Sequence, residues 1–331
     1  MLSTPKISIV IAMYNIEKYI VNCLESCLNQ KGVTEDEYEI VVVDDGSTDG
    51  SYALAEEAIR GHNNSRIITK KNGGLSSARN AGIDVVRGEY VWFVDGDDAI
   101  APNAIEVLVG RIAESHCDAY IHNFSTFEDK ELIATSNFVG YEQVLSGKEI
   151  HNRYQRIMPM MAWLTVYRSA LLKEKHLRFR EGIIHEDMEF SIRGHHKAES
   201  IMFVREALYY YRVARKDSIM SSAQKDNTRS LVSMIEIIQS FEEFFCAEDG
   251  LFARKVIGVC ATLFVIRRYD DAFVLNDSTR KLVKNNKWRI YRSMWRSKQW
   301  KRRALLIFVL LMPKVIVGKV LFKLGERSKL M

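Results

Sequence analysis

The chain has 331 residues, of which 47% are hydrophobic and four are proline, so its composition excludes a disordered protein and its length allows one large or two smaller domains. None of the five cysteines forms a Cys-x-x-Cys pair, which argues against a zinc or thiol-redox motif and favours reduced, buried thiols. The formal net charge is +5, but residues 280–331 hold sixteen Lys and Arg and one acidic residue, so the rest of the chain is net acidic.

The first 123 residues alternate predicted strands and helices. Apolar runs predict strands at 7–13, 38–44, 67–68, 90–94 and 119–121, and apolar residues recur at helical spacing in 19–28, 55–59 and 105–112. Strands that are apolar nearly throughout, each followed by a helix, indicate an α/β protein with a largely parallel central sheet flanked by helices. The chain enters its first strand without a charged-then-apolar leader, so we expect no secretory signal and a cytoplasmic active site.

Carboxylates follow two of these strands. Asp44 and Asp45 end the second strand, and Asp95, Asp97 and Asp98 end the fourth. Because ligands of parallel sheets bind at the carboxyl ends of the strands, we expect both groups in one cleft. Three carboxylates within four positions repel one another unless a cation is bound, and oxygen ligands with free positions for phosphate suit Mg²⁺ or Mn²⁺. The alternative is a solvated turn that caps a helix.

Two glycine-containing segments lie between these carboxylates. In residues 44–50, Gly46 permits a tight turn before a capped helix, so the segment is either a strand–turn–helix junction or a place where a carboxylate accepts a hydrogen bond from a nucleotide base. In residues 72–82, glycines allow close approach of the backbone, and Arg79 falls in the first turns of a helix, where it could meet a diphosphate.

The order of these motifs carries more information than any one of them. Met13-Tyr14-Asn15, the Asp44–Gly50 segment, the Asn72–Gly82 segment and Asp95-Gly96-Asp97-Asp98 follow one another as in family 2 glycosyltransferases. The chain resembles the bacterial members that build polysaccharides, specifically over residues 6–125 and more weakly to about residue 222. The resemblance implies the nucleotide-sugar-binding fold called GT-A, a nucleotide-sugar donor and sugar transfer.

The resemblance also implies roles for single residues. Asp45 would contact the base, and Asp95 and Asp97 would form the Asp-x-Asp pair near the ribose and a Mn²⁺ or Mg²⁺ ion, which acts as a Lewis acid on the leaving diphosphate. Asp98 would either be a third metal ligand or begin the next helix. The full set expected at the donor nucleotide is Tyr14, Asn15, Asp44, Asp45, Gly74, Arg79, Asp95, Gly96 and Arg212. For Arg212, aromatic packing at a strand end is the alternative.

A catalytic base is expected in the segment 184–190. Asp187 stands where the family places its base, beside Glu186, and a carboxylate there could take the proton of an attacking hydroxyl. His185 could orient Asp187 or the acceptor, or be structural. Without the resemblance, the segment reads as the start of a surface helix.

The rest of the chain divides less sharply. We expect a GT-A domain over 1–225, with a nucleotide-binding half to 123 and an acceptor-shaping half over 124–225, and a helical basic region over 226–331. The apolar run 304–312 is too short to span a bilayer, but many cations flank it and three tryptophans precede it (Trp288, Trp295 and Trp300), so we expect residues 280–330 to lie on an anionic membrane surface. A helix packed on the catalytic domain is the alternative, and the apolar content disfavours nucleic acid.

These patterns predict a metal-dependent, inverting glycosyltransferase at the cytoplasmic face of the membrane. It would move one sugar, hexose or N-acetylhexosamine, from a nucleotide donor, with UDP expected, to a lipid-linked or oligosaccharide acceptor of a surface polysaccharide. Single transfer is expected because the Gln-x-x-Arg-Trp signature of processive synthases does not follow Asp187. The alternatives are a catalytically silent nucleotide-sugar-binding scaffold and a nucleotidyltransferase that releases pyrophosphate. The oligomeric state is not predicted.

Overall fold

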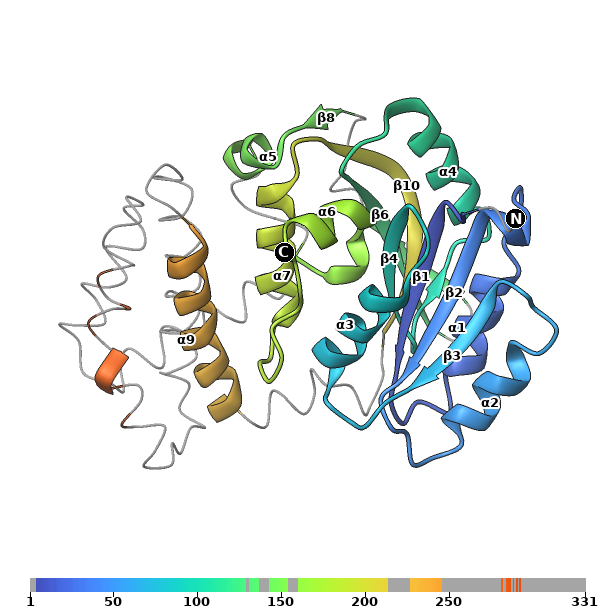
Figure 1. Cartoon of the computed structure of the whole chain (residues 1–331), viewed down its shortest axis with the longest axis horizontal. Helices are drawn as coiled ribbons and strands as arrows, with labels where there is room; N and C mark the ends of the chain where they lie inside the picture. Colours follow the sequence, from blue (N-terminus) through green and yellow to red (C-terminus); the bar gives the residue numbers. More distant parts are fainter. Residues whose placement is uncertain are drawn as a thin grey trace. The chain divides into compact units, whose positions relative to one another are not determined.

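The computed structural model describes residues 4–128, 131–136, 143–153, 160–213 and 227–245, together with helical residues at 281, 284–286, 288, 290 and 292. The chain divides into two compact units (Figure 1). The first comprises Met1–Gly182 and Glu186–Arg215, and the second Ile183–His185 and Lys216–Met331. The expected boundary near residue 225 and most of the segment 280–330 lie outside the described residues.

In the described part of the first unit, the strands form one mixed sheet of ten. One half is parallel, in the order β3-β2-β1-β4: β1 (Ile7–Met13), β2 (Tyr38–Asp44), β3 (Ser65–Thr69) and β4 (Tyr90–Asp95). Every residue of β1 and β2 is buried, as expected for central strands covered on both faces. The apolar runs therefore predicted this half of the sheet, with β1 and β2 at their observed bounds.

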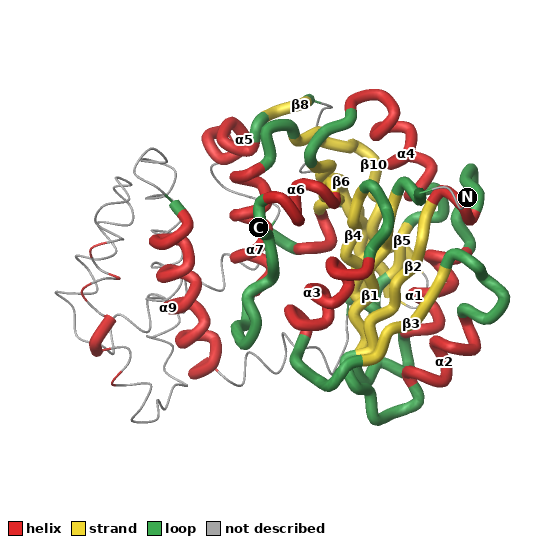
Figure 2. Tube along the Cα trace, viewed as in Figure 1, coloured by secondary structure: helices red, strands yellow, loops and turns green. Residues whose placement is uncertain are grey.

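Helices cover both faces of this half (Figure 2). On one face, α1 (Ile20–Leu28), α2 (Ser51–Ala58) and α4 (Ala104–Ser115) share a core with alternate residues of β1, such as Ile9 and Ile11. On the other face, α3 (Leu75–Val85) packs with the intervening residues, such as Val10 and Ala12. The two-residue period of the strand thus separates two cores.

The other half of the sheet is mixed. A short strand, β9 (Thr165–Arg168), runs antiparallel between β4 and β6 (Ala119–Glu128), and β6 pairs in parallel with β10 (Ile201–Arg212), which pairs with the antiparallel β5 (Ala99–Ile100). The 3₁₀ segment η1 (Glu35–Glu37) directly precedes β2 in the parallel half. In the mixed half, the antiparallel strands β7 (Glu131–Thr135) and β8 (Val144–Leu145) pair with β6 and β10, and the other elements are the 3₁₀ segment η2 (Ala162–Leu164) and the helices α5 (Gly147–Arg153), α6 (Ser169–Glu174) and α7 (Glu186–Lys197).

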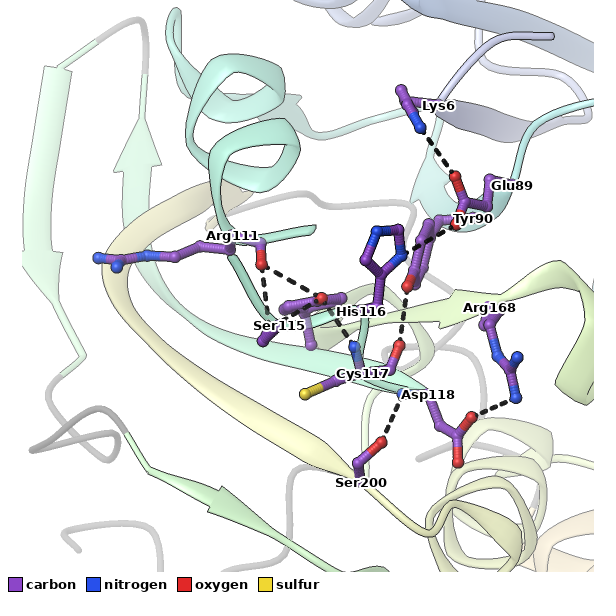
Figure 3. Close-up of polar contacts among 11 residues, drawn as sticks. Lys6, Glu89, Tyr90, Arg111, Ser115, His116, Cys117, Asp118, Arg168 and Ser200 are labelled. Carbon is purple, nitrogen blue, oxygen red and sulfur yellow. Dashed lines mark hydrogen bonds and ion pairs between the residues drawn. The ribbon is translucent and has the colours of Figure 1, made fainter. Parts of the chain in front are cut away.

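The register brings the polar strand ends together. Met13 of β1 is opposite Asp44, and Ala12 is opposite Asp95, so the carboxyl ends of β1, β2 and β4 meet at one edge, as predicted. The opposite edge is closed by a separate polar network (Figure 3), in which Arg168 pairs with Asp118 at 2.6 Å and the Tyr90 hydroxyl donates to the Cys117 carbonyl. The two edges are thus chemically distinct.

The second unit contains the predicted helix that follows residue 226, α9 (Asn227–Phe244), with Leu231, Ile235, Ile238 and Phe241 buried. Within this unit the Ile184 backbone N–H donates to the Ser233 hydroxyl at 2.8 Å. Among the described residues, no helix combines the length and apolar character that crossing a membrane requires.

Candidate active site

Arg79 is the centre of the site. The helix α3 carries it to a position where its side chain is 3% exposed, with the guanidinium 5.1 Å from the centre of the Phe179 ring. Its Nη2 donates to Asp95 Oδ1 at 2.6 Å, and its Nη1 donates to Glu186 Oε1 at 3.0 Å. One buried cation therefore joins the end of β4 to the start of α7.

Asp187 follows Glu186 in the first turn of α7 and is partly buried. Burial and the neighbouring Glu186 carboxylate raise the pKa of Asp187 to about 7, while the Arg79 guanidinium opposes the shift. Burial alone would lower the pKa of Arg79, but the carboxylates of Asp95 and Glu186 raise it above its usual value, so Arg79 stays charged. The arrangement therefore gives a carboxyl that can exchange a proton near neutral pH.

Asp98 does not begin a helix, because α4 begins only at Ala104, and its role as a metal ligand stays a prediction. Its side chain is 2% exposed, and each carboxylate oxygen accepts a hydrogen bond from β10: Oδ2 from the Tyr209 hydroxyl at 2.7 Å and Oδ1 from the Arg212 backbone N–H at 2.8 Å. Burial, Asp97 and Asp95 raise the pKa of Asp98. The expectation that Asp98 begins a helix is therefore wrong.

Arg212 lies beside the same loop. Its Nε donates to the Asp97 carbonyl at 2.7 Å and its Nη2 donates to Asn22 Oδ1 at 2.7 Å. The guanidinium is 4.4 Å from the centre of the Phe127 ring and 5.2 Å from that of Tyr19. The aromatic contacts agree with the packing alternative given for Arg212, and its role at the donor nucleotide stays a prediction.

Asp45 holds the glycine turn that precedes α3. Its carboxylate accepts hydrogen bonds from the backbone N–H groups of Gly73 and Gly74, at 3.0 and 2.7 Å, and pairs with Lys70 at 2.7 Å. Gly74 has φ +86° and ψ 172°, a conformation that is almost confined to glycine. The neighbouring Asp44 accepts the Ser47 backbone N–H at 3.0 Å.

Tyr14 and Asn15 line the same edge after β1. Asn15, with φ +49°, donates its backbone N–H to the Ser47 hydroxyl at 3.2 Å and accepts the Thr48 N–H at 2.8 Å, which fixes the loop after β2. The Tyr14 side chain is 46% exposed. At Gly96, an added Cβ would lie 2.4 Å from the end of the Ile16 side chain and 3.1 Å from the Ala12 carbonyl oxygen, so a larger residue would have to displace Ile16 where the loop passes β1.

His185 belongs to the second unit rather than to this cluster. Its backbone φ is +69°, and its Nε2 lies 3.2 Å from the Ser230 hydroxyl on α9. This contact agrees with the structural alternative that was left open for His185. A role toward Asp187 stays a prediction.

Residues 8–174, half of the chain, match the sequence model of the family described as glycosyl transferase family 2. The chain belongs to this family. It is 35% identical over 245 residues to EpsH of Bacillus subtilis (strain 168), which is named as a glycosyltransferase, and the match covers 72% of this chain and 70% of EpsH. Other relatives are longer, and the chain spans 32% and 61% of the length of two of them.

Solved structures of low sequence identity show the same fold. The crystal structure of S. aureus TarS 1–349 in complex with UDP-GlcNAc has a TM-score of 0.69 and 22% identity, covering 97% of this chain and 92% of that one. The mannosyltransferase PcManGT from Pyrobaculum calidifontis, in complex with GDP-Man and Mn²⁺, has a TM-score of 0.52 and 14% identity, covering 96% and 86%. The expected family and the α/β fold of the GT-A type are therefore confirmed.

The carboxylates at the polar edge of this glycosyltransferase fit a metal ion only when phosphate oxygens of a substrate complete its coordination. Within the described parts of the chain, no three His, Cys, Asp or Glu side chains are grouped to hold an ion. Asp95 and Asp97 supply hard carboxylate oxygens at the strand edge, whereas Asp98 is bound to β10. Two carboxylates are what Mg²⁺ or Mn²⁺ needs from a protein when phosphate oxygens complete its coordination.

Sequence reasoning missed two functional contacts of this family 2 enzyme. Lys70 was not singled out, although it pairs with Asp45, because a lysine after a short strand carries no signal of its own. Tyr209 was not singled out either, because it stands in a run of three tyrosines before Arg212 in which nothing marks one ring from the next. The alternation of a strand puts Tyr209 and Tyr211 on one face, but it does not show that the Tyr209 hydroxyl reaches Asp98.

Proposed function

We propose that this glycosyltransferase is metal-dependent and inverting, and that it transfers one sugar from a UDP-sugar to a lipid-linked or oligosaccharide acceptor of a bacterial surface polysaccharide. The observation that carries the proposal is the Arg79 bridge, because it joins Asp95, on the expected donor side, to the Glu186–Asp187 pair, on the expected acceptor side. A scaffold that only bound the donor would have no need of a proton-accepting carboxyl next to it.

In this proposal the polar edge of the sheet holds the donor. The exposed Tyr14 ring offers a stacking surface for the base, and the base then lies beside the Asp45 carboxylate, which also accepts the Gly73 and Gly74 N–H groups. Asp95 and Asp97 hold Mn²⁺ or Mg²⁺, which when bound supplies positive charge to the diphosphate. The UDP complexes of TarS support UDP as the nucleotide, and the Mn²⁺ in the PcManGT complex supports the metal.

Asp187 then acts on the acceptor. Its carboxylate takes the proton of the acceptor hydroxyl while that oxygen forms a bond to the anomeric carbon of the sugar. The bond between the anomeric carbon and the diphosphate oxygen breaks, and its electron pair leaves with UDP. Attack from the face opposite the leaving group inverts the anomeric configuration. Arg79 keeps Glu186, and with it the start of α7, in a fixed relation to Asp95.

A panel of UDP-, GDP- and TDP-sugars tests the donor and the metal together. A UDP-sugar should raise the melting temperature of the full chain in the presence of Mn²⁺ and much less in the presence of a chelator, because a ligand that binds the folded state stabilises it. Equal stabilisation with and without Mn²⁺ would contradict the metal requirement. Formation of pyrophosphate in place of UDP would favour a nucleotidyltransferase.

A further inference from the structure

Tyr209 contacts both ends of the loop that carries the expected metal ligands. The tyrosine is completely buried in β10, and its hydroxyl donates to Asp98 Oδ2 at 2.7 Å. The same hydroxyl accepts the Asp95 backbone N–H at 3.1 Å. One oxygen atom thus ties the last residue of β4 to the last residue of the Asp95–Asp98 loop.

Arg212 of β10 adds a second set of contacts to this loop. Its backbone N–H donates to Asp98 Oδ1 at 2.8 Å, and its Nε donates to the Asp97 carbonyl at 2.7 Å. Beyond the loop, β5 pairs directly with Tyr209 and Tyr210. Hydrogen bonds to a carboxylate are stronger than those between neutral groups, and burial protects them from water. The loop is therefore held along its length by one strand.

Aromatic packing fixes the Tyr209 ring in place. The indole of Trp163 stacks on it, with ring centres 4.3 Å apart and planes 8° apart. The ring centre of Trp92 lies 6.3 Å from that of Tyr209. The Trp92 Nε1–H donates to the Trp163 carbonyl at 2.8 Å, which fixes Trp163 in turn. The phenol is therefore rigid, and its hydroxyl has a defined position.

We propose that Tyr209 is a positioning residue for sugar transfer and that Asp98 is its anchor rather than a metal ligand. Together they fix the backbone of Asp95 and Asp97, so that these two carboxylates are directed to the metal and the donor diphosphate. The inference rests on the proposed function. Residues that hydrogen-bond to metal ligands without touching the metal typically change metal affinity by about 10- to 100-fold when they are removed.

The test is Tyr209→Phe in the full chain, with UDP and Mn²⁺ as the probes. This change removes only the hydroxyl and keeps the stacked ring. We expect Mn²⁺-dependent UDP binding to weaken at least about tenfold in calorimetry, and the Asp95 amide, which loses its acceptor, to exchange its hydrogen faster. The matched control is Tyr210→Phe, the next residue on β10, whose ring lies against Phe127 and which should bind like the wild type.

Asp98→Asn separates an anchor from a metal ligand. If Asp98 is an anchor, the single variants Asp98→Asn and Tyr209→Phe lose similar affinity, and the double variant loses no more than either, because both remove the same contact. Additive losses, with Asp98→Asn alone abolishing Mn²⁺ binding, would overturn the inference. Wild-type affinity and amide exchange in Tyr209→Phe would overturn it as well. A wild-type chain that binds no UDP with Mn²⁺ would instead contradict the proposed function, and the positioning role with it.

Discussion

At the scale of single residues, Asp187 is the group whose chemistry is set most clearly by its surroundings. Its pKa of about 7, raised by burial and by Glu186, means that it is ionised only above neutral pH in the free protein. Since a general base must be deprotonated, we expect kcat/KM for the acceptor to fall about tenfold per pH unit below pH 7 and to level above it. A profile that is flat from pH 5 to 8 would contradict this assignment.

The same shift predicts a change in stability. The folded chain holds the Asp187 proton more tightly than the unfolded chain, whose carboxyl has the usual value of 3.8, so this group destabilises the fold as pH rises from about 4 through 7. Asp187→Asn cannot ionise and should melt at a higher temperature than the wild type at pH 8. At pH 4 the two should melt alike, and calorimetric scans at both values test the sign.

Replacing Asp187 also tests catalysis itself. Asp187→Asn should lower kcat by at least about a hundredfold, because a general base typically contributes 10²–10⁴ to the rate, while donor affinity stays nearly unchanged. Asp84→Asn, a surface carboxylate paired with Arg178, is the control and should keep full activity. Normal turnover of Asp187→Asn would show that the base is another residue and would revive the scaffold hypothesis.

Arg79→Lys tests the bridge between the two halves of the site. The lysine ammonium is a compact group without the planar fork of arginine, so it cannot reproduce the two bonds that separate nitrogens of Arg79 make to Asp95 and Glu186, and we expect at least about a hundredfold loss in kcat together with a lower melting temperature. The matched control is Arg168→Lys, which weakens the pair with Asp118 at the opposite edge of the sheet (Figure 3). It should lower stability without changing KM for the donor.

Single residues also show what a sequence can predict about this site. Asp95 and Glu186 were singled out because each stands in a segment that carries the resemblance, but the bridge that Arg79 makes between them was not predicted, because Arg79 and Glu186 are 107 positions apart. The role of Asp98, as a metal ligand or at the start of a helix, was left open for a related reason. The groups that bind it come from β10, more than a hundred residues later, and no local pattern indicates such a contact.

At the scale of elements, the parallel half of the sheet was predictable and the mixed half was not. The strands β1 and β2 are apolar over their whole length because both faces are covered, and this pattern alone gives their bounds. β9 has four residues and enters the sheet between β4 and β6 only because of pairing with strands far away in sequence. Short runs of this kind carry no periodicity that would distinguish them from a loop.

The turn before α3 gives a prediction at this scale. Gly74 has no atoms within 4 Å of the position of an added Cβ, so Gly74→Ala is penalised by its backbone conformation and not by a clash. We expect a loss of about 2 kcal/mol in unfolding free energy and weaker UDP binding, since the Gly74 N–H would leave Asp45. Gly110→Ala, within α4 and equally open, should instead stabilise by about 0.5–1 kcal/mol.

At the scale of the whole molecule, the charge distribution is the feature that the described residues do not explain. The first unit holds the residues proposed to bind the nucleotide and to transfer the proton, whereas most of the basic segment 280–331 lies outside the described residues. The donor chemistry proposed above uses no residue of this segment. A membrane surface has anionic headgroups above an apolar layer. Such a surface would pair with the cations of this segment and would bury its apolar run 304–312.

We therefore expect the full chain to sediment with vesicles of phosphatidylglycerol and phosphatidylcholine, and much less with phosphatidylcholine alone. Each cation near such a surface contributes about 1 kcal/mol, so changing Lys301, Arg302 and Arg303 to Gln together should weaken binding roughly a hundredfold, and added salt should have a similar effect. Activity on a soluble acceptor should not change, because the catalytic residues lie elsewhere. If removal of residues 280–331 left sedimentation undiminished, the attachment would have to reside in another part of the chain.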